Sequence, residues 1–185
     1  MDEPTTIELP TTGEVRRSTS YAADKDRILN RLRRIEGQVR GVAQMVADGA
    51  PPLPRADEPH VTLLSDADAT DMAALAGHAQ PGPWGPATHR YGPFFGVRDS
   101  GRLLAMGGQR MLMPGMAEVS GVATWQDCRG RGLARTLIGH VMRAMVERGE
   151  QPFLHSYADN EGAIALYESL GFRIRRKVHV LVIAR

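Results

Sequence analysis

The stretch FLHSYADNEGAIALYESLGF, from Phe153 to Phe172, decides the fold of this 185-residue chain. It predicts a strand, Gln151–Tyr157, followed by a helix that Asp159 or Asn160 can cap with its side chain. The helix is expected to end near Leu170, because a glycine followed by an apolar residue is a common helix terminus. Four apolar side chains of this helix share one face: Ala163, Leu166, Tyr167 and Leu170.

A glycine-spaced loop lies upstream, in the stretch CRGRGLARTLIGH, Cys128–His140. Gly130 and Gly132 lack Cβ atoms, so backbone N–H groups there can converge on an anion. The predicted helix Gly132–Arg148 adds unpaired N–H donors and the positive end of its dipole, and the arginines add charge. Taken alone, the loop fits either a pyrophosphate cradle or an ordinary solvent-exposed helix start.

The rest of the chain after residue 59 also alternates strands and helices. A helix capped by Ser65 or Asp66 is expected to run to about Gly77. A three-strand meander then feeds a strand–helix–strand unit. The other predicted strands are His60–Leu64, Phe94–Arg98, Arg102–Gln109, Ala117–Thr124 and Ile174–Ala184.

Two motifs, in this order, resemble those of the GNAT superfamily of N-acetyltransferases. The first is R-x-x-G-x-A at Arg129, Gly132 and Ala134, and the second is D-N-x-x-A-x-x-L-Y-x-x-L-G-F from Asp159 to Phe172. The resemblance covers about residues 60–185. It implies the GNAT fold, an α/β (α+β) domain with a mixed central sheet flanked by helices, in which acetyl-CoA lies between two splayed strands.

The resemblance also implies which residues bind acetyl-CoA. Main-chain groups of Val122, Ala123 and Thr124 would face the pantetheine arm, and Asn160 would hydrogen-bond the same arm. No metal ion is expected. The pyrophosphate would be held by the loop and the first helical turn: Arg129, Gly130, Arg131, Gly132, Leu133, Ala134 and Arg135.

The expected catalytic residues are Tyr167 and Glu118. Tyr167 matches the general acid of the family, which protonates the departing thiolate; the alternative is an aromatic side chain that only packs. Glu118 lies eleven residues before Arg129, a spacing similar to the histone-acetyltransferase branch, where a glutamate is the base. The alternative is an exposed strand glutamate. His155 is a weaker candidate for the base.

The acceptor pocket is expected near the aromatic residues that precede the meander. Trp84, Tyr91 and Phe94 lie where the family places its substrate loop and first long strand. Aromatic residues beside proline and glycine also pack locally, so both interpretations remain open.

The N-terminal part of the chain has a different character. Residues 1–20 are polar and are expected to be disordered. Residues 21–48 are predicted to form one separate helix, because six apolar residues recur in a heptad pattern, and residues 49–59 form a proline-rich linker. The stretch RLRRIEGQVRGV, Arg31–Val42, resembles the first helix of CsoR/RcnR-type metal-sensing repressors. We expect a weak homodimer through residues 21–48.

Composition excludes several classes of protein. The net charge is +2, so nucleic acid is not an expected partner. The chain has one cysteine, which cannot form an internal disulfide, and no run of roughly 18 apolar residues suited to a membrane span. The acidic, polar N-terminus is not that of a secretory signal. We therefore expect a reduced, cytoplasmic protein.

These observations predict an acyltransferase enzyme, an N-acetyltransferase that moves acetyl from acetyl-CoA to an amine acceptor by direct attack in a ternary complex. The acceptor would be a small-molecule or peptide amine. The competing hypotheses are an acyl-CoA-responsive regulator, in which the N-terminal helix dimerises or contacts DNA, and a non-catalytic acyl-CoA-binding module.

Overall fold

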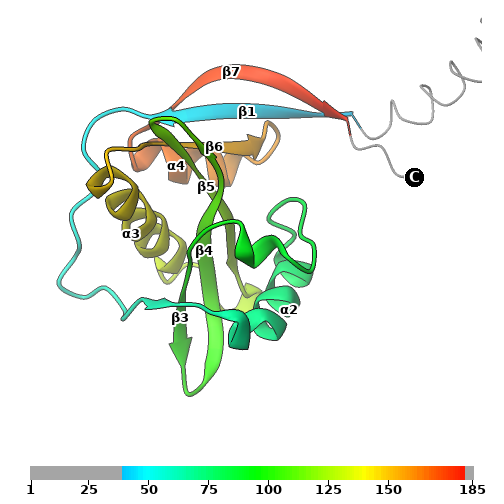
Figure 1. Ribbon diagram of the computed structural model, residues 1–185, viewed down its shortest axis with the longest axis vertical. Helices are drawn as coiled ribbons and strands as arrows, with labels where there is room; N and C mark the ends of the chain where they lie inside the picture. Colours follow the sequence, from blue (N-terminus) through cyan, green and yellow to red (C-terminus); the bar gives the residue numbers. More distant parts are fainter. Residues whose placement is uncertain (1–38, 182–185) are drawn as a thin grey trace, which may run out of the picture. The chain divides into compact units, whose positions relative to one another are not determined.

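The computed structural model describes residues 39–181, and within them a seven-stranded mixed sheet carries helices on both faces (Figure 1). The strand order is β2-β3-β4-β5-β6-β1-β7, and β5 and β6 are a parallel pair. The elements are β1 (Val39–Ala47), β2 (Thr62–Leu63), α2 (Ala69–Ala79), β3 (Phe94–Asp99), β4 (Arg102–Met113), β5 (Met116–Thr124), α3 (Leu133–Glu147), β6 (Gln151–Tyr157), α4 (Glu161–Ser169) and β7 (Phe172–Leu181), with short 3-10 helices at Asp66–Asp68, Thr88–Arg90 and Gln126–Cys128.

The elements predicted after residue 59 are confirmed within the described residues, with small shifts at their ends. Residues 182–184 of the last predicted strand lie outside the described residues. The helix expected from Ser65 begins there as a 3-10 turn, and Ser65 and Asp68 form a capping box before α2. The main helix, expected over Gly132–Arg148, is α3, and Asn160 caps α4 as predicted. The mixed sheet flanked by helices confirms the expected fold class.

The single helix predicted over residues 21–48 is wrong for residues 39–47. These residues form β1, which pairs antiparallel with β6 from Val42↔Tyr157 to Val46↔Phe153 and lies between β6 and β7. Alternate side chains of β1 enter the core at Ala43, Met45 and Ala47. The sheet therefore begins before residue 60, the predicted start of the domain, and the remaining residues of the predicted helix, 21–38, lie outside the described residues.

The segment between β1 and β2 contains no helix or strand over residues 48–61. It runs along α3, where Arg143 Nη1 donates to the Pro52 carbonyl at 2.7 Å and Arg143 lies 3.8 Å from Glu58. Four prolines in this segment limit its backbone freedom. The path of the segment lets β1 join the sheet beside β6 although β2 lies at the opposite edge.

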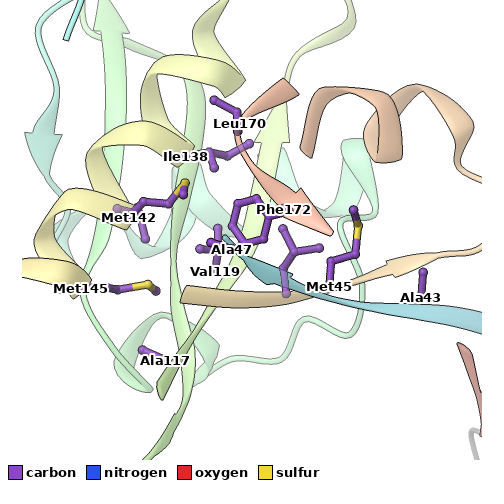
Figure 2. Close-up of a cluster of buried hydrophobic side chains, with 12 residues drawn as sticks. Ala43, Met45, Ala47, Ala117, Val119, Ile138, Met142, Met145, Leu170 and Phe172 are labelled. Atoms are coloured by element: carbon purple, nitrogen blue, oxygen red, sulfur yellow. The ribbon is translucent and has the colours of Figure 1, made fainter. Parts of the chain in front are cut away.

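A continuous apolar core joins β1, β5, β6, α3 and the residues that follow α4. Figure 2 shows Met142 and Met145 of α3 directed toward Phe172 of β7 and Met45 of β1. Met45, Met145 and Phe172 are fully buried. A second core, on the other side of β4 and β5, packs α2 against the sheet, so α2 and α3 flank these strands on opposite faces (Figure 1).

Candidate active site

The parallel strands β5 and β6 pair only over their first residues. Their register runs from Met116↔Gln151 to Glu118↔Phe153 and ends there. Just beyond, two residues of β5, Gly121 and Val122, stand opposite one residue of β4, because the register passes from Gly108↔Ser120 to Met106↔Ala123. A bulge of this kind bends its strand. The sheet is therefore opened between β5 and β6, where the resemblance places the acyl donor.

Glycine is required at the bulge for two reasons. Gly121 has φ +63°, a conformation that side chains disfavour, and a Cβ there would lie 2.6 Å from Cε1 of Phe94. Trp84 also packs against this position and meets Phe94 edge to face, with the ring centroids 5.4 Å apart. The aromatic pair therefore supports the bend of β5 from the α2 face of the sheet.

The main chain after the bulge belongs to the residues predicted to face the pantetheine arm. Ala123 is buried against α2, whereas Val122 packs toward α3. Thr124 Oγ1 is buried and finds no hydrogen-bond partner among the described residues. An orphaned hydroxyl beside an opened strand fits a site that a polar ligand completes.

The loop before α3 has the geometry of an anion cradle. Gly130 and Gly132 have φ +78° and +77°, and a Cβ at either position would meet only open space. Gly132 is the N-cap and makes no side-chain hydrogen bond, so it leaves the first N–H groups of α3 without a side-chain cap. Arg129 and Arg131 are exposed beside them. The loop thus fits a pyrophosphate at a helix N-terminus.

Leu133 and Arg135, also expected in the cradle, contribute differently. Leu133 is buried and anchors the start of α3 in the core. Arg135 Nη1 donates to Ser169 Oγ at 3.0 Å, which ties the first turn of α3 to the end of α4. Ala134 lies between them and is partly exposed.

Helix α4 carries the other two residues predicted on this side of the sheet. Asn160 Oδ1 accepts from the Ala163 N–H at 3.2 Å and so caps the helix. Tyr167 lies two turns further on, the spacing that returns to the same face. Its ring packs on Phe172, with centroids 6.1 Å apart, and burial raises the pKa of the Tyr167 hydroxyl. The phenol therefore stays protonated at neutral pH, as a proton donor must.

Glu118 lies on the opposite face of the sheet, because its neighbours Ala117 and Val119 point into the core beneath α3. Its carboxylate is 1% exposed and accepts from Arg110 Nε and Nη2, both at 3.1 Å. His155 Nδ1 lies 2.8 Å from Glu118 Oε1. Burial alone would raise the pKa of Glu118, but the hydrogen bonds from His155 and Arg110 outweigh it and lower the pKa.

Arg110 was not among the site residues predicted from the sequence. Its partner Glu118 lies across the turn at Pro114-Gly115, and a hairpin there pairs β4 with β5 from Met113↔Met116 upward. Extending the register of the turn would place Met111 opposite Glu118. The register shift between Gln109 and Leu112 brings Arg110 there instead, and no local signal in the sequence marks that shift. The expected exposed-strand alternative for Glu118 does not hold, because the side chain is buried.

The three residues expected in the acceptor pocket lie in different environments. Tyr91 is 58% exposed, Trp84 is partly exposed, and Phe94 is 1% exposed within the core beneath α2. Phe94 therefore does not offer a surface to an acceptor, and it acts on the site by supporting Trp84 and the β5 bulge.

No helix within residues 39–181 is long and apolar enough to cross a membrane. No cluster of three or more His, Cys, Asp or Glu side chains in the same range is suited to a metal ion.

The sequence matches two family models. The Acetyltransferase (GNAT) family matches residues 59–172, and the Metal-sensitive transcriptional repressor family matches residues 24–53. Within the second match, the described residues include β1, which is a strand. The first match covers both motifs and the opened pair of strands.

The curated relatives that the chain matches include acetyltransferases. The chain is 31% identical to the N-alpha-acetyltransferase RimI of Mycobacterium tuberculosis, over 67% of this chain and 87% of that protein. It is 42% identical to the mycothiol acetyltransferase of Corynebacterium aurimucosum over 33% of this chain, and the match spans only 20% of that protein.

Solved structures lead to the same family. A GNAT-family acetyltransferase from Novosphingobium aromaticivorans is 53% identical, with a TM-score of 0.71, over 77% of this chain and 63% of that one. The ribosomal-protein-S18-alanine N-acetyltransferase of Escherichia coli is 26% identical, with a TM-score of 0.54, over 60% of this chain and 76% of that one. With the family match, the glycine cradle and the opened strands, these findings show that the chain belongs to the GNAT acetyltransferase family.

Proposed function

We propose that this protein transfers an acetyl group from acetyl-CoA to a primary amine by direct attack within a ternary complex. The observation that carries the proposal is the end of β5–β6 pairing at Glu118↔Phe153, directly before a bulge that turns the β5 main chain into a free edge. Side chains on both faces of the sheet could then contact a thioester bound between β5 and β6.

The residues of the two faces would have separate roles. Backbone N–H groups of β5 would stabilise the oxyanion that forms on the acetyl carbonyl. Tyr167, protonated and packed on the α3 and α4 side, would protonate the departing sulfur. The paired Glu118 and His155 on the α2 side would handle the proton of the attacking ammonium.

The glycine cradle at α3 would hold the pyrophosphate, with Arg129 and Arg131 supplying charge from exposed positions. This anchors the donor far from the bond that breaks and so fixes its orientation. Thr124 Oγ1, buried without a partner among the described residues, would gain one from the pantetheine arm.

The acceptor would be an amine on a peptide or a small molecule. One of the relatives is named an N-alpha-acetyltransferase, and one of the solved structures is that of a ribosomal-protein-S18-alanine N-acetyltransferase. An α-amino group on an alanine is therefore the first acceptor to try.

The regulator hypothesis receives no support from the described part of the chain. Its dimerising or DNA-contacting helix was to span residues 21–48, and residues 39–47 are instead an internal strand of the sheet. A binding module without activity remains the competing outcome.

The experiment is a thiol-release assay with acetyl-CoA and three acceptors: an alanine-initiated peptide, an acetyl-capped lysine peptide and a small primary amine. We expect thiol release that depends on at least one amine, with the acetylated product seen by mass spectrometry. Binding of acetyl-CoA with no amine-dependent release from any acceptor would instead identify a binding module.

A further inference from the structure

We propose that His155 Nε2 is the atom that accepts the proton of the acceptor ammonium, and that Glu118 is a positioning residue behind it. This inference rests on the proposed function and assigns the proton transfer within the same site. It replaces the simpler expectation that Glu118 itself is the base.

Glu118 is poorly arranged to meet a substrate. Both carboxylate oxygens are engaged: Oε2 with Arg110 Nε, and Oε1 with Arg110 Nη2 and with His155 Nδ1. The side chain is 1% exposed, whereas His155 is 25% exposed. The group that an incoming amine can reach is therefore the imidazole.

The hydrogen bond between the two residues fixes the form of the imidazole. Glu118 stays ionised, because its hydrogen bonds to His155 and Arg110 outweigh the burial that would otherwise raise its pKa. An ionised carboxylate only accepts hydrogen bonds, so His155 Nδ1 must carry the proton of this contact. In the neutral ring the lone pair then lies on Nε2, which is the state that a base requires.

The strands around His155 supply few other charges. Glu118 on β5 and Arg110 on β4 form the charged pair, and Gln44 of β1, the register partner of His155, is uncharged. Tyr157, two residues along β6 on the same face, is the remaining titratable neighbour on that strand and has contacts of its own. Phe153 meets the imidazole edge to face, with centroids 5.8 Å apart, and fixes its plane.

The proton balance of the reaction follows. Nε2 takes one proton from the ammonium, which frees the nitrogen lone pair to form the bond to the acetyl carbon. As the carbon–sulfur bond breaks, sulfur keeps the electron pair and takes a proton from the Tyr167 hydroxyl. The acceptor nitrogen loses its second proton, and that proton restores the Tyr167 hydroxyl. The imidazolium, stabilised by Glu118, releases its proton to solvent.

The test compares His155→Gln and Glu118→Gln by the pH dependence of kcat/KM, with acetyl-CoA and the alanine-initiated peptide. His155→Gln should lower kcat/KM by about 10²-fold or more and remove the acidic limb of the profile. Glu118→Gln should keep the acidic limb and lower kcat/KM less than His155→Gln, because the imidazole that accepts the proton is still present. The control is His60→Gln, at an exposed position, which should change neither.

The opposite pattern would overturn the proposal: a limb retained in His155→Gln and abolished in Glu118→Gln would make Glu118 the base. Acetyl-CoA affinity measured by calorimetry should match the wild type in both variants, which separates a proton-transfer defect from a folding defect.

A second measurement needs no turnover. Nitrogen NMR of histidine-labelled protein, with the His155→Gln variant to assign the signal, should show the Nδ1–H tautomer of His155 at neutral pH. The Nε2–H tautomer would contradict the proposal even if acetyl transfer is established. Failure of every amine in the thiol-release assay, by contrast, would refute the proposed function whatever the tautomer.

Discussion

At the scale of single residues, the proposed role of the Tyr167 hydroxyl as an acid can be separated from the packing of its ring. Tyr167→Phe keeps the ring and its contact with Phe172 and removes only the proposed acid. We expect kcat to fall by about 10²- to 10⁴-fold, the usual contribution of a positioned acid, with acetyl-CoA affinity unchanged. Steady-state kinetics and calorimetry check this, and an unchanged kcat would assign the proton to water.

The same scale shows which residue roles were predictable. The cap at Asn160 could be predicted from local sequence, because an asparagine directly before a helix commonly accepts a hydrogen bond from a backbone N–H of the first turn. The burial of Phe94 and the pairing of Glu118 with Arg110 and His155 depend on which strands become neighbours. His155 lies 37 residues from Glu118 in the sequence, and the register shift that brings Arg110 beside Glu118 has no local signal.

At the scale of elements, β1 is where the structure differs most from the prediction made from local sequence. Met45 is fully buried between β6 and β7, so Met45→Ala should lower the free energy of unfolding by about 2–5 kcal/mol. The matched control is Leu53→Ala, an apolar truncation at a side chain that is 84% exposed in the following segment, with an expected change within about 0.5 kcal/mol. Equal urea midpoints for the two variants would contradict the placement of β1 in the sheet.

Strand β1 was predicted as part of a helix because its apolar residues fit a helical spacing as well as the alternation of a strand. The predicted helix used Val39, Val42 and Val46 as part of a heptad stripe, whereas the strand buries Ala43, Met45 and Ala47 in the α3-side core. Gly41 weakens a helix, and the β-branched valines favour a strand over a helix. The partners β6 and β7, which decide between the two, come more than a hundred residues later. The helices α3 and α4 were predictable because cap, stripe and terminus agree within each one.

At the scale of the whole molecule, the homodimer predicted through residues 21–48 loses part of its expected contact surface. Val42 is 6% exposed within the sheet, so it cannot also pair with a second copy while β1 stays in place. The rest of the predicted contact surface, in residues 21–38, lies outside the described residues. The central claim for the molecule is instead that the cradle before α3 and the opened strands together hold acetyl-CoA.

The measurement that tests this claim most directly is acetyl-CoA binding by calorimetry to the wild type, Gly132→Asp and Gly149→Asp. Both glycines have a positive φ and open surroundings, +77° and +75°, so both variants carry the same backbone strain at opposite ends of α3. Only Gly132→Asp adds bulk and negative charge at the cradle. We predict a loss of more than tenfold in affinity, about 1.4 kcal/mol, for Gly132→Asp and wild-type affinity for Gly149→Asp. Equal affinity in all three proteins, or no binding to the wild type, would contradict the account.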